Sequence, residues 1–164
     1  MESLHEQGKF GGAARHASVE INQIIEQEKI THLLDYGCGK KQILKQHLKP
    51  VDGFRYQAYD PGVPKLSGDP VPAEVVVACD VLEHIEPQCI DDVLDHIEEL
   101  TEFLFYATIS TRKAAKKLSD GRNAHLIQQP MEWWLPKIWE RFVIQSFVRQ
   151  GSGFMVMATK GLIL

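Results

Sequence analysis

A chain of 164 residues with 44% hydrophobic side chains is the size of one domain and can bury a sizeable core. Its formal net charge of −4 gives no overall positive field that would attract nucleic acid or an anionic membrane. No apolar run approaches the roughly 20 residues that span a bilayer, and three cysteines outside any CxxC pair argue against a disulfide framework or a structural zinc site.

The N-terminal segment, residues 1–12, is polar and glycine-rich around a single Phe10. Apolar residues at helical spacing then predict a helix over residues 13–29. Two interpretations of the start stay open: a disordered tail, or a flap in which Phe10, Gly11 and Gly12 close over a ligand. The start lacks the basic residues and apolar stretch of a signal peptide, so a cytoplasmic location is expected.

The central feature is a short apolar strand over residues 31–36 that runs into a turn with Gly37 and Gly39. A helix is expected over residues 42–48. This order places a backbone turn and a helix N-terminus against a ligand, and glycine lets the ligand approach the backbone closely. Asp35, at the strand end, adds an acceptor for a cationic group. Asp60 ends a second strand, over residues 54–59, about 20 residues after the glycine turn, where doubly wound sheets hold a ribose.

Further strands are expected over residues 74–79 and 103–109, with a helix opened by Pro87 between them. Residues 75–78 are apolar without alternation and residues 103–109 are again apolar, which is typical of buried parallel strands. A helical stretch begins at Pro130, and residues 142–148 and 154–159 form a hairpin around Gly151. The alternation predicts an α/β fold, a layered sandwich on a largely parallel sheet that ends in an antiparallel hairpin.

Three segments carry a resemblance to a known family: Leu34 to Gly39, Tyr59-Asp60-Pro61, and Cys79 to Ile85 with its Leu-Glu-His-Ile sequence. Together they resemble the class I S-adenosylmethionine-dependent methyltransferases, above all those that act on small molecules. The resemblance covers residues 30–109 well and the remainder loosely. It implies a Rossmann-like three-layer sandwich, with S-adenosylmethionine as cofactor and S-adenosylhomocysteine as product.

The resemblance also implies which residues bind the cofactor. Asp35, Gly37 and Gly39 are expected at its methionine end. Asp60, expected at a surface strand end, would accept hydrogen bonds from the ribose hydroxyls. The full set of expected cofactor-binding residues is Asp35, Tyr36, Gly37, Cys38, Gly39, Asp60, Pro61, Asp80 and Val81.

The chain departs from the family pattern at two places. The family usually has a third glycine where this chain has Lys41, whose side chain would either crowd the methionine end of the cofactor or point outward. Between residues 61 and 72, four prolines forbid a regular helix. The family has a helix and a strand in that interval, so the sheet is expected to be trimmed at one edge.

The resemblance divides the single domain into three parts: an N-terminal flap and helix (1–30), a cofactor-binding core (31–109), and an acceptor-side loop, helix and hairpin (110–164). Basic residues gather over residues 111–122. They form either a solvated loop or a substrate rim that attracts anionic groups.

Two histidines are candidates for a general base. His84 follows the third strand, and its alternative role is to fix the strand-to-helix turn. His125 follows the basic loop, and its alternative is an ordinary loop histidine. His96, on a helical pattern, is expected to be an ordinary surface residue, and no cluster has metal-ligand spacing along the chain.

The leading hypothesis is an enzyme that moves a methyl group to a small-molecule or nucleotide-like acceptor by in-line displacement. A nucleic-acid acceptor is disfavoured because the chain lacks the Asn/Asp-Pro-Pro-aromatic sequence of amino-methylating DNA enzymes. The alternative is a non-catalytic cofactor-binding or regulatory module. A third hypothesis has a second copy complete the trimmed edge, forming a homodimer.

Overall fold

The computed structural model describes residues 12–49 and 51–161. The flap residues Phe10 and Gly11 therefore lie outside the described residues. The helices are α1 (Gly12–Gln27), α2 (Ile43–His47), α3 (Ile90–Leu100) and α4 (Met131–Trp139), with short 3-10 helices η2 (Pro64–Leu66), η3 (Leu82–His84) and η4 (Pro87–Cys89). The strands are β1 (His32–Tyr36), β2 (Arg55–Tyr59), β3 (Ala73–Cys79), β4 (Thr101–Ser110), β5 (Val143–Gln150) and β6 (Gly153–Thr159).

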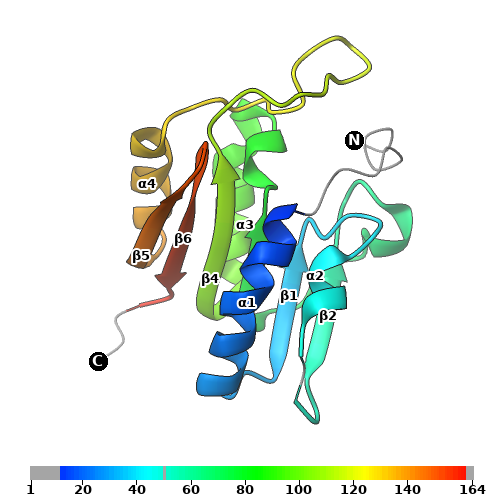
Figure 1. Ribbon diagram of the computed structural model, residues 1–164, viewed down its shortest axis with the longest axis vertical. Helices are drawn as coiled ribbons and strands as arrows, with labels where there is room; N and C mark the ends of the chain where they lie inside the picture. The colour runs from blue at the N-terminus through cyan, green and yellow to red at the C-terminus, as the bar shows by residue number, and fades with distance from the viewer. Residues whose placement is uncertain (1–11, 50, 162–164) are drawn as a thin grey trace.

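The strands form one six-stranded sheet in the order β2-β1-β3-β4-β6-β5. β2, β1, β3 and β4 are parallel, whereas β6 pairs antiparallel with both β4 and β5. Helices cover both faces of the sheet, with α1 and α2 on one face and α3 and α4 on the other (Figure 1). The α/β three-layer fold and its terminal antiparallel hairpin are confirmed.

Successive residues of the central strands point to opposite faces, so each strand contributes to two cores. Leu34 of β1 packs in the core formed with α3 and α4, and its neighbour Leu33 packs in the core formed with α1 and α2. Both side chains are fully buried. This burial on two faces explains the continuous apolar runs, because neither face of a parallel sheet meets water.

The interval after β2 lacks a regular helix and a strand, as expected. Residues 61–72 contain only the short helix η2, so β2 is an edge strand and the sheet is trimmed there. The helix after the glycine turn differs from expectation: α2 has five residues, and Gln42 before it adopts a left-handed conformation with φ of 45°. None of the helices within the described ranges is long and apolar enough to cross a membrane.

Candidate functional site

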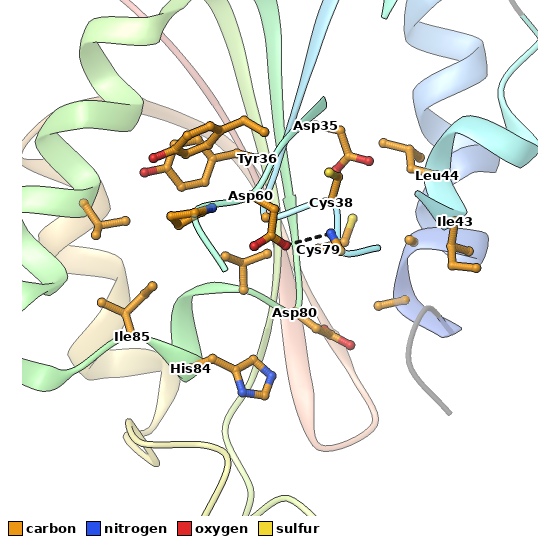
Figure 2. A pocket seen from close by; sticks show the side chains of 18 of the residues that line it. Asp35, Tyr36, Cys38, Ile43, Leu44, Asp60, Cys79, Asp80, His84 and Ile85 are labelled. Carbon is orange, nitrogen blue, oxygen red and sulfur yellow. Dashed lines mark hydrogen bonds between the residues drawn. The ribbon is translucent and has the colours of Figure 1, made fainter. Parts of the chain in front are cut away.

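The site lies where the parallel strands end. From β1 the chain passes to β2 on one side and then to β3 on the other, so the loops after β1 and β3 leave the sheet in different directions. Such a switch point opens a crevice at the carboxyl ends of the strands. A cavity of about 580 Å³ occupies it, and Figure 2 shows its wall.

The cavity gathers the residues that are expected to bind a cofactor. All nine of them line it, and His84 lines it as well. His125 does not line the cavity, but its ring contacts that of His84, with the ring centroids 4.9 Å apart. The lining residues include Asp35, Tyr36, Gly37, Cys38, Gly39, Asp60, Pro61, Asp80 and Val81.

The glycine turn after β1 requires glycine for two separate reasons. Gly37 has φ of +75° and Gly39 has φ of +64°, which only glycine adopts without strain. A β-carbon at Gly37 would also lie 2.6 Å from the side chain of Val81. The Gly37 amide donates to the carbonyl oxygen of Tyr59 at 2.7 Å, so the turn is held against the end of β2.

Asp60 connects the two loops beneath the cavity. Its Oδ2 accepts the Gly39 amide at 2.8 Å (Figure 2), and its Oδ1 accepts the Gly62 amide at 2.8 Å. The side chain is buried, with 3% of the residue exposed. The expectation of a carboxylate at a surface strand end was therefore wrong, because the carboxylate turns inward to accept one amide of the glycine turn and one of the loop after β2.

Asp35 lies below the turn and is also buried. Its Oδ2 accepts the Tyr56 hydroxyl at 2.5 Å. Burial raises the pKa of Asp35 to about 7, against the opposing effect of the Tyr56 hydrogen bond. The carboxyl group therefore changes charge near neutral pH.

An aromatic wall closes the cavity on the side of α3. The Tyr36 hydroxyl and His96 Nδ1 are hydrogen-bonded at 3.0 Å, and the Tyr36 and Tyr59 ring centroids are 4.9 Å apart. Ile85 and Val93 also line the cavity. His96 is therefore not the ordinary surface residue expected from its helical pattern. The pattern showed only that it lies on α3, not that this side of α3 meets the end of β2.

The end of β3 carries polar groups with unusual environments. Asp80 has φ of 53°, a conformation that non-glycine residues adopt mainly at turns and functional sites, and its Oδ1 accepts the Thr108 hydroxyl at 3.0 Å. Glu83 is fully buried, and its Oε1 accepts the Ser110 amide at 3.0 Å. Burial raises the pKa of Glu83 to about 8, and the charge of Asp80 adds to the rise.

Lys41, which stands where the family resemblance leads one to expect a third glycine, lies at the rim of the cavity and is exposed. Its backbone carbonyl accepts the side-chain amide of Gln46, which stabilises the short turn of α2. An exposed lysine at the rim leaves the interior to the glycine turn and the carboxylates.

The combination of walls suits a ligand with distinct parts. Aromatic and aliphatic side chains can stack on a flat ring. The glycine turn lets a ligand come close to the backbone, whose polar groups can form hydrogen bonds with it. Carboxylates can accept hydrogen bonds from hydroxyl groups or pair with a cation.

Solved structures share this architecture, although neither a protein-family model nor a curated protein matches the chain. Magnesium protoporphyrin IX methyltransferase from Synechocystis PCC 6803, crystallised with SAH, has a TM-score of 0.63 at 12% identity over 91% of this chain and 84% of that one. An N1-methyltransferase of 1,6-didemethyltoxoflavin from Burkholderia thailandensis, with that compound and S-adenosylhomocysteine bound, has a TM-score of 0.64 at 15% identity over 98% and 85%. The methyltransferase domain of bacterial CtHen1-CN has a TM-score of 0.63 at 13% identity over 90% and 100%. The fold is that of the class I methyltransferases.

Replacing Gly37 by alanine tests the packing of the turn. We expect Gly37→Ala to lose about 1–2 kcal/mol from its positive φ and about 1–3 kcal/mol more from the contact with Val81. Gly53→Ala is the matched control, because Gly53 has φ of +79° but open space where its β-carbon would lie. Urea unfolding of both variants measures the difference. If the Val81 contact matters, adding Val81→Ala to Gly37→Ala should recover part of the lost stability. Equal losses of unfolding free energy in Gly37→Ala and Gly53→Ala would show that Val81 does not restrict the turn.

Asp35→Asn tests the buried carboxyl group. Because the folded pKa lies above the unfolded value, the folded chain holds a proton that the unfolded chain releases, and stability falls as pH rises from about 4 to about 7. The variant lacks this dependence. At about 1.4 kcal/mol per pH unit, it should gain up to about 4 kcal/mol relative to the wild type at pH 8 but little at pH 4. Parallel curves of unfolding free energy against pH would contradict the assignment, and exposed Asp52→Asn is the control for loss of charge.

Proposed function

We propose that the chain is an S-adenosylmethionine-dependent methyltransferase that acts on a small-molecule or nucleotide-like acceptor. The observation that carries the proposal is the cavity at the switch point, around which the nine residues expected from the family resemblance come together. The fold neighbours crystallised with S-adenosylhomocysteine support the same cofactor.

The polar groups and the size of the cavity fit the cofactor. A volume of about 580 Å³ is within the range of sites for ligands of this size. Asp35, Asp60 and Asp80 supply acceptors for an amino group and for ribose hydroxyls, and their negative charge suits a sulfonium cation. The absence of side chains at Gly37 and Gly39 leaves space for the ligand beside the backbone.

The aromatic wall gives the adenine ring a place to stack. Tyr36, Tyr59 and His96 present ring surfaces, and Ile85 and Val93 present aliphatic ones. When bound, the cofactor supplies a methyl group on a sulfonium, which a nucleophile displaces in line. The protein has to hold both reactants in line and keep water out, and such alignment is worth several kcal/mol of barrier.

The acceptor side of the proposed site lies beyond the end of β3, next to the loop over residues 111–125. His84 lines the cavity there, so it is the better placed of the two proposed general bases. The loop should attract an anionic acceptor less strongly than its number of basic residues suggests. Arg122 binds Glu86 at 2.8 Å and Asp120 at 2.7 Å, which offsets its charge.

The division into an N-terminal flap and helix, a cofactor core and an acceptor-side part belongs to this proposal. Gly12 and Ala13, at the start of α1, line the cavity and are in reach of a bound cofactor. A cytoplasmic location also remains part of the proposal, supported by three cysteines that are all unpaired with one another.

Calorimetric titration with S-adenosylmethionine, and separately with S-adenosylhomocysteine, tests the cofactor. We expect saturable binding of each, near one per chain. Asp60→Asn should weaken both by about ten-fold or more, because it replaces a carboxylate acceptor by an amide and loosens the glycine turn. Asp52→Asn, at an exposed turn away from the cavity, should bind as the wild type does. If the folded wild type binds neither compound, the proposed cofactor is wrong.

Turnover separates the enzyme from a non-catalytic binding module. Formation of S-adenosylhomocysteine would be followed with a panel of hydroxyl, amine and carboxylate acceptors. We expect at least one acceptor to give turnover that rises in proportion to protein concentration. A chain that binds the cofactor but transfers no methyl group to any acceptor, at any protein concentration, would favour the regulatory module.

A further inference from the structure

We propose that Glu83, His84 and His125 form a binding site for a divalent transition-metal ion at the wall of the cavity. Glu83 and His84 belong to η3, and His125 lies in the loop before α4. One nitrogen of each ring and one carboxylate oxygen lie within 4.8 Å of one another. Spacing along the chain did not reveal this cluster, because the third ligand comes from a distant loop.

The carboxylate of Glu83 is the first observation that points to a cation. The residue is fully buried, and its Oε1 accepts the Ser110 amide at 3.0 Å. Its Oε2 is buried and has no hydrogen-bond partner among the described residues. A buried carboxylate oxygen without a partner is costly, and buried charges in native proteins are paired or coordinate metals. A cation bound by Oε2 would remove this cost.

The orientation of the two imidazole rings is the second observation. His84 Nδ1 lies 2.7 Å from the Ala124 carbonyl oxygen, and His125 Nδ1 lies 2.6 Å from the Arg112 carbonyl oxygen. A carbonyl oxygen only accepts, so each Nδ1 carries the hydrogen and donates it. The lone pair of each neutral ring is then on Nε2. Metal-binding histidines show this arrangement, in which the second nitrogen donates to a backbone carbonyl and fixes the ring.

The loop that brings His125 to η3 is tied in place. The Ile127 amide donates to the Glu83 carbonyl oxygen at 3.0 Å. Asn123 Oδ1 accepts the amides of Ala114 and His125, at 2.9 and 3.0 Å, and its Nδ2 donates to the Ala114 carbonyl oxygen. The third ligand is thus preorganised, whereas the rings of His84 and His125 are half-buried and leave a path for an ion.

The donor set indicates the class of metal. Two imidazoles and one carboxylate are typical of zinc and iron(II) sites, whereas calcium takes six to eight oxygen ligands. Ligand atoms on one zinc ion are roughly 3.3 Å apart, given metal–ligand distances of about 2.0–2.1 Å. The ligand atoms would need to move closer by about 1.5 Å at most, which small shifts of the three side chains can supply.

The metal site gives the acceptor side of the cavity a further role. Three protein ligands leave at least one position for water or substrate. Since His84 lines the cavity, an ion held here can take an oxygen ligand, such as a hydroxyl or carboxylate, from the acceptor. A bound metal occupies the Nε2 lone pairs, so both histidines would then act as ligands rather than as general bases. This role in acceptor binding rests on the proposed function; the metal site itself does not.

Titration of the chelator-treated, metal-free protein with Co²⁺, followed by visible absorption, tests the site. We expect one Co²⁺ per chain, displaced by Zn²⁺, with no thiolate-to-metal band, because no cysteine belongs to the cluster. Glu83→Gln keeps an acceptor for the Ser110 amide but removes the charge, and His125→Gln alters a half-buried loop residue. Each should weaken Co²⁺ binding roughly 10–100-fold or more. His47→Gln, which changes a half-buried histidine away from the site, is the control and should bind Co²⁺ normally.

Each outcome bears on the metal site separately from methyl transfer. Loss of Co²⁺ binding in both cluster variants, with binding kept in His47→Gln, supports the site. If Glu83→Gln fails to fold, His125→Gln alone decides. No Co²⁺ binding by the wild type, or equal binding by wild type and His125→Gln, overturns the inference. Calorimetry with S-adenosylmethionine on the same metal-free protein tests the cofactor proposal separately. Binding of S-adenosylmethionine without Co²⁺ binding would overturn the metal site alone, and Co²⁺ binding without S-adenosylmethionine binding would overturn the cofactor alone.

Discussion

The hydrogen bond from the Gly39 amide to the buried carboxylate of Asp60 connects the two loops on which the cavity depends. A long helix after the glycine turn would fix the turn by packing and by its own backbone hydrogen bonds. Here α2 has only five residues and follows a left-handed Gln42, so it provides little of that support. Asp60 compensates, because the same carboxylate also accepts the Gly62 amide in the loop after β2. The shape of this wall of the cavity is therefore set by one carboxyl group rather than by a helix.

Three buried carboxylates surround the end of the sheet, and each is stabilised differently. Asp60 has an amide on each oxygen. Asp35 has one hydroxyl from Tyr56, and its raised pKa lets it take a proton at the working pH of most proteins. Glu83 has one amide and one oxygen without a partner among the described residues. The fold satisfies the two oxygens of Glu83 least, so Glu83 is the strongest candidate of the three for a cation ligand.

The sequence was sufficient to predict the fold and to single out residues that meet at one cavity, because both depend on local patterns. Parallel strands show as continuous apolar runs, and residues directly after them must meet at one edge of the sheet. Asp35 and Asp60 were found in this way, and Asp80 through the resemblance of the segment from Cys79 to Ile85. The orientation of Asp60 could not be predicted, because it depends on unpaired amides in a turn rather than on the strand end. His96 and the pairing of His84 with His125 could not be predicted either, since they depend on how α3 and a distant loop pack against the strand ends.

The two ends of the cavity would thus favour ligand groups of opposite charge. At the glycine turn, Asp35 and Asp60 favour a ligand that carries positive charge, and burial strengthens the attraction because little water screens it. Under the proposed function, methyl transfer replaces a sulfonium by a neutral thioether, so the carboxylates hold the substrate form of the cofactor more tightly than the product form. At the end of β3, a metal ion on Glu83 would reverse the sign of the local field and favour an oxygen-bearing acceptor. A cation held by the protein on one side and a cation carried by the cofactor on the other would orient an electron-rich acceptor between them. The acceptor specificity would then be set by the distance between these two charges rather than by the basic loop, whose Arg122 is already paired with Glu86 and Asp120.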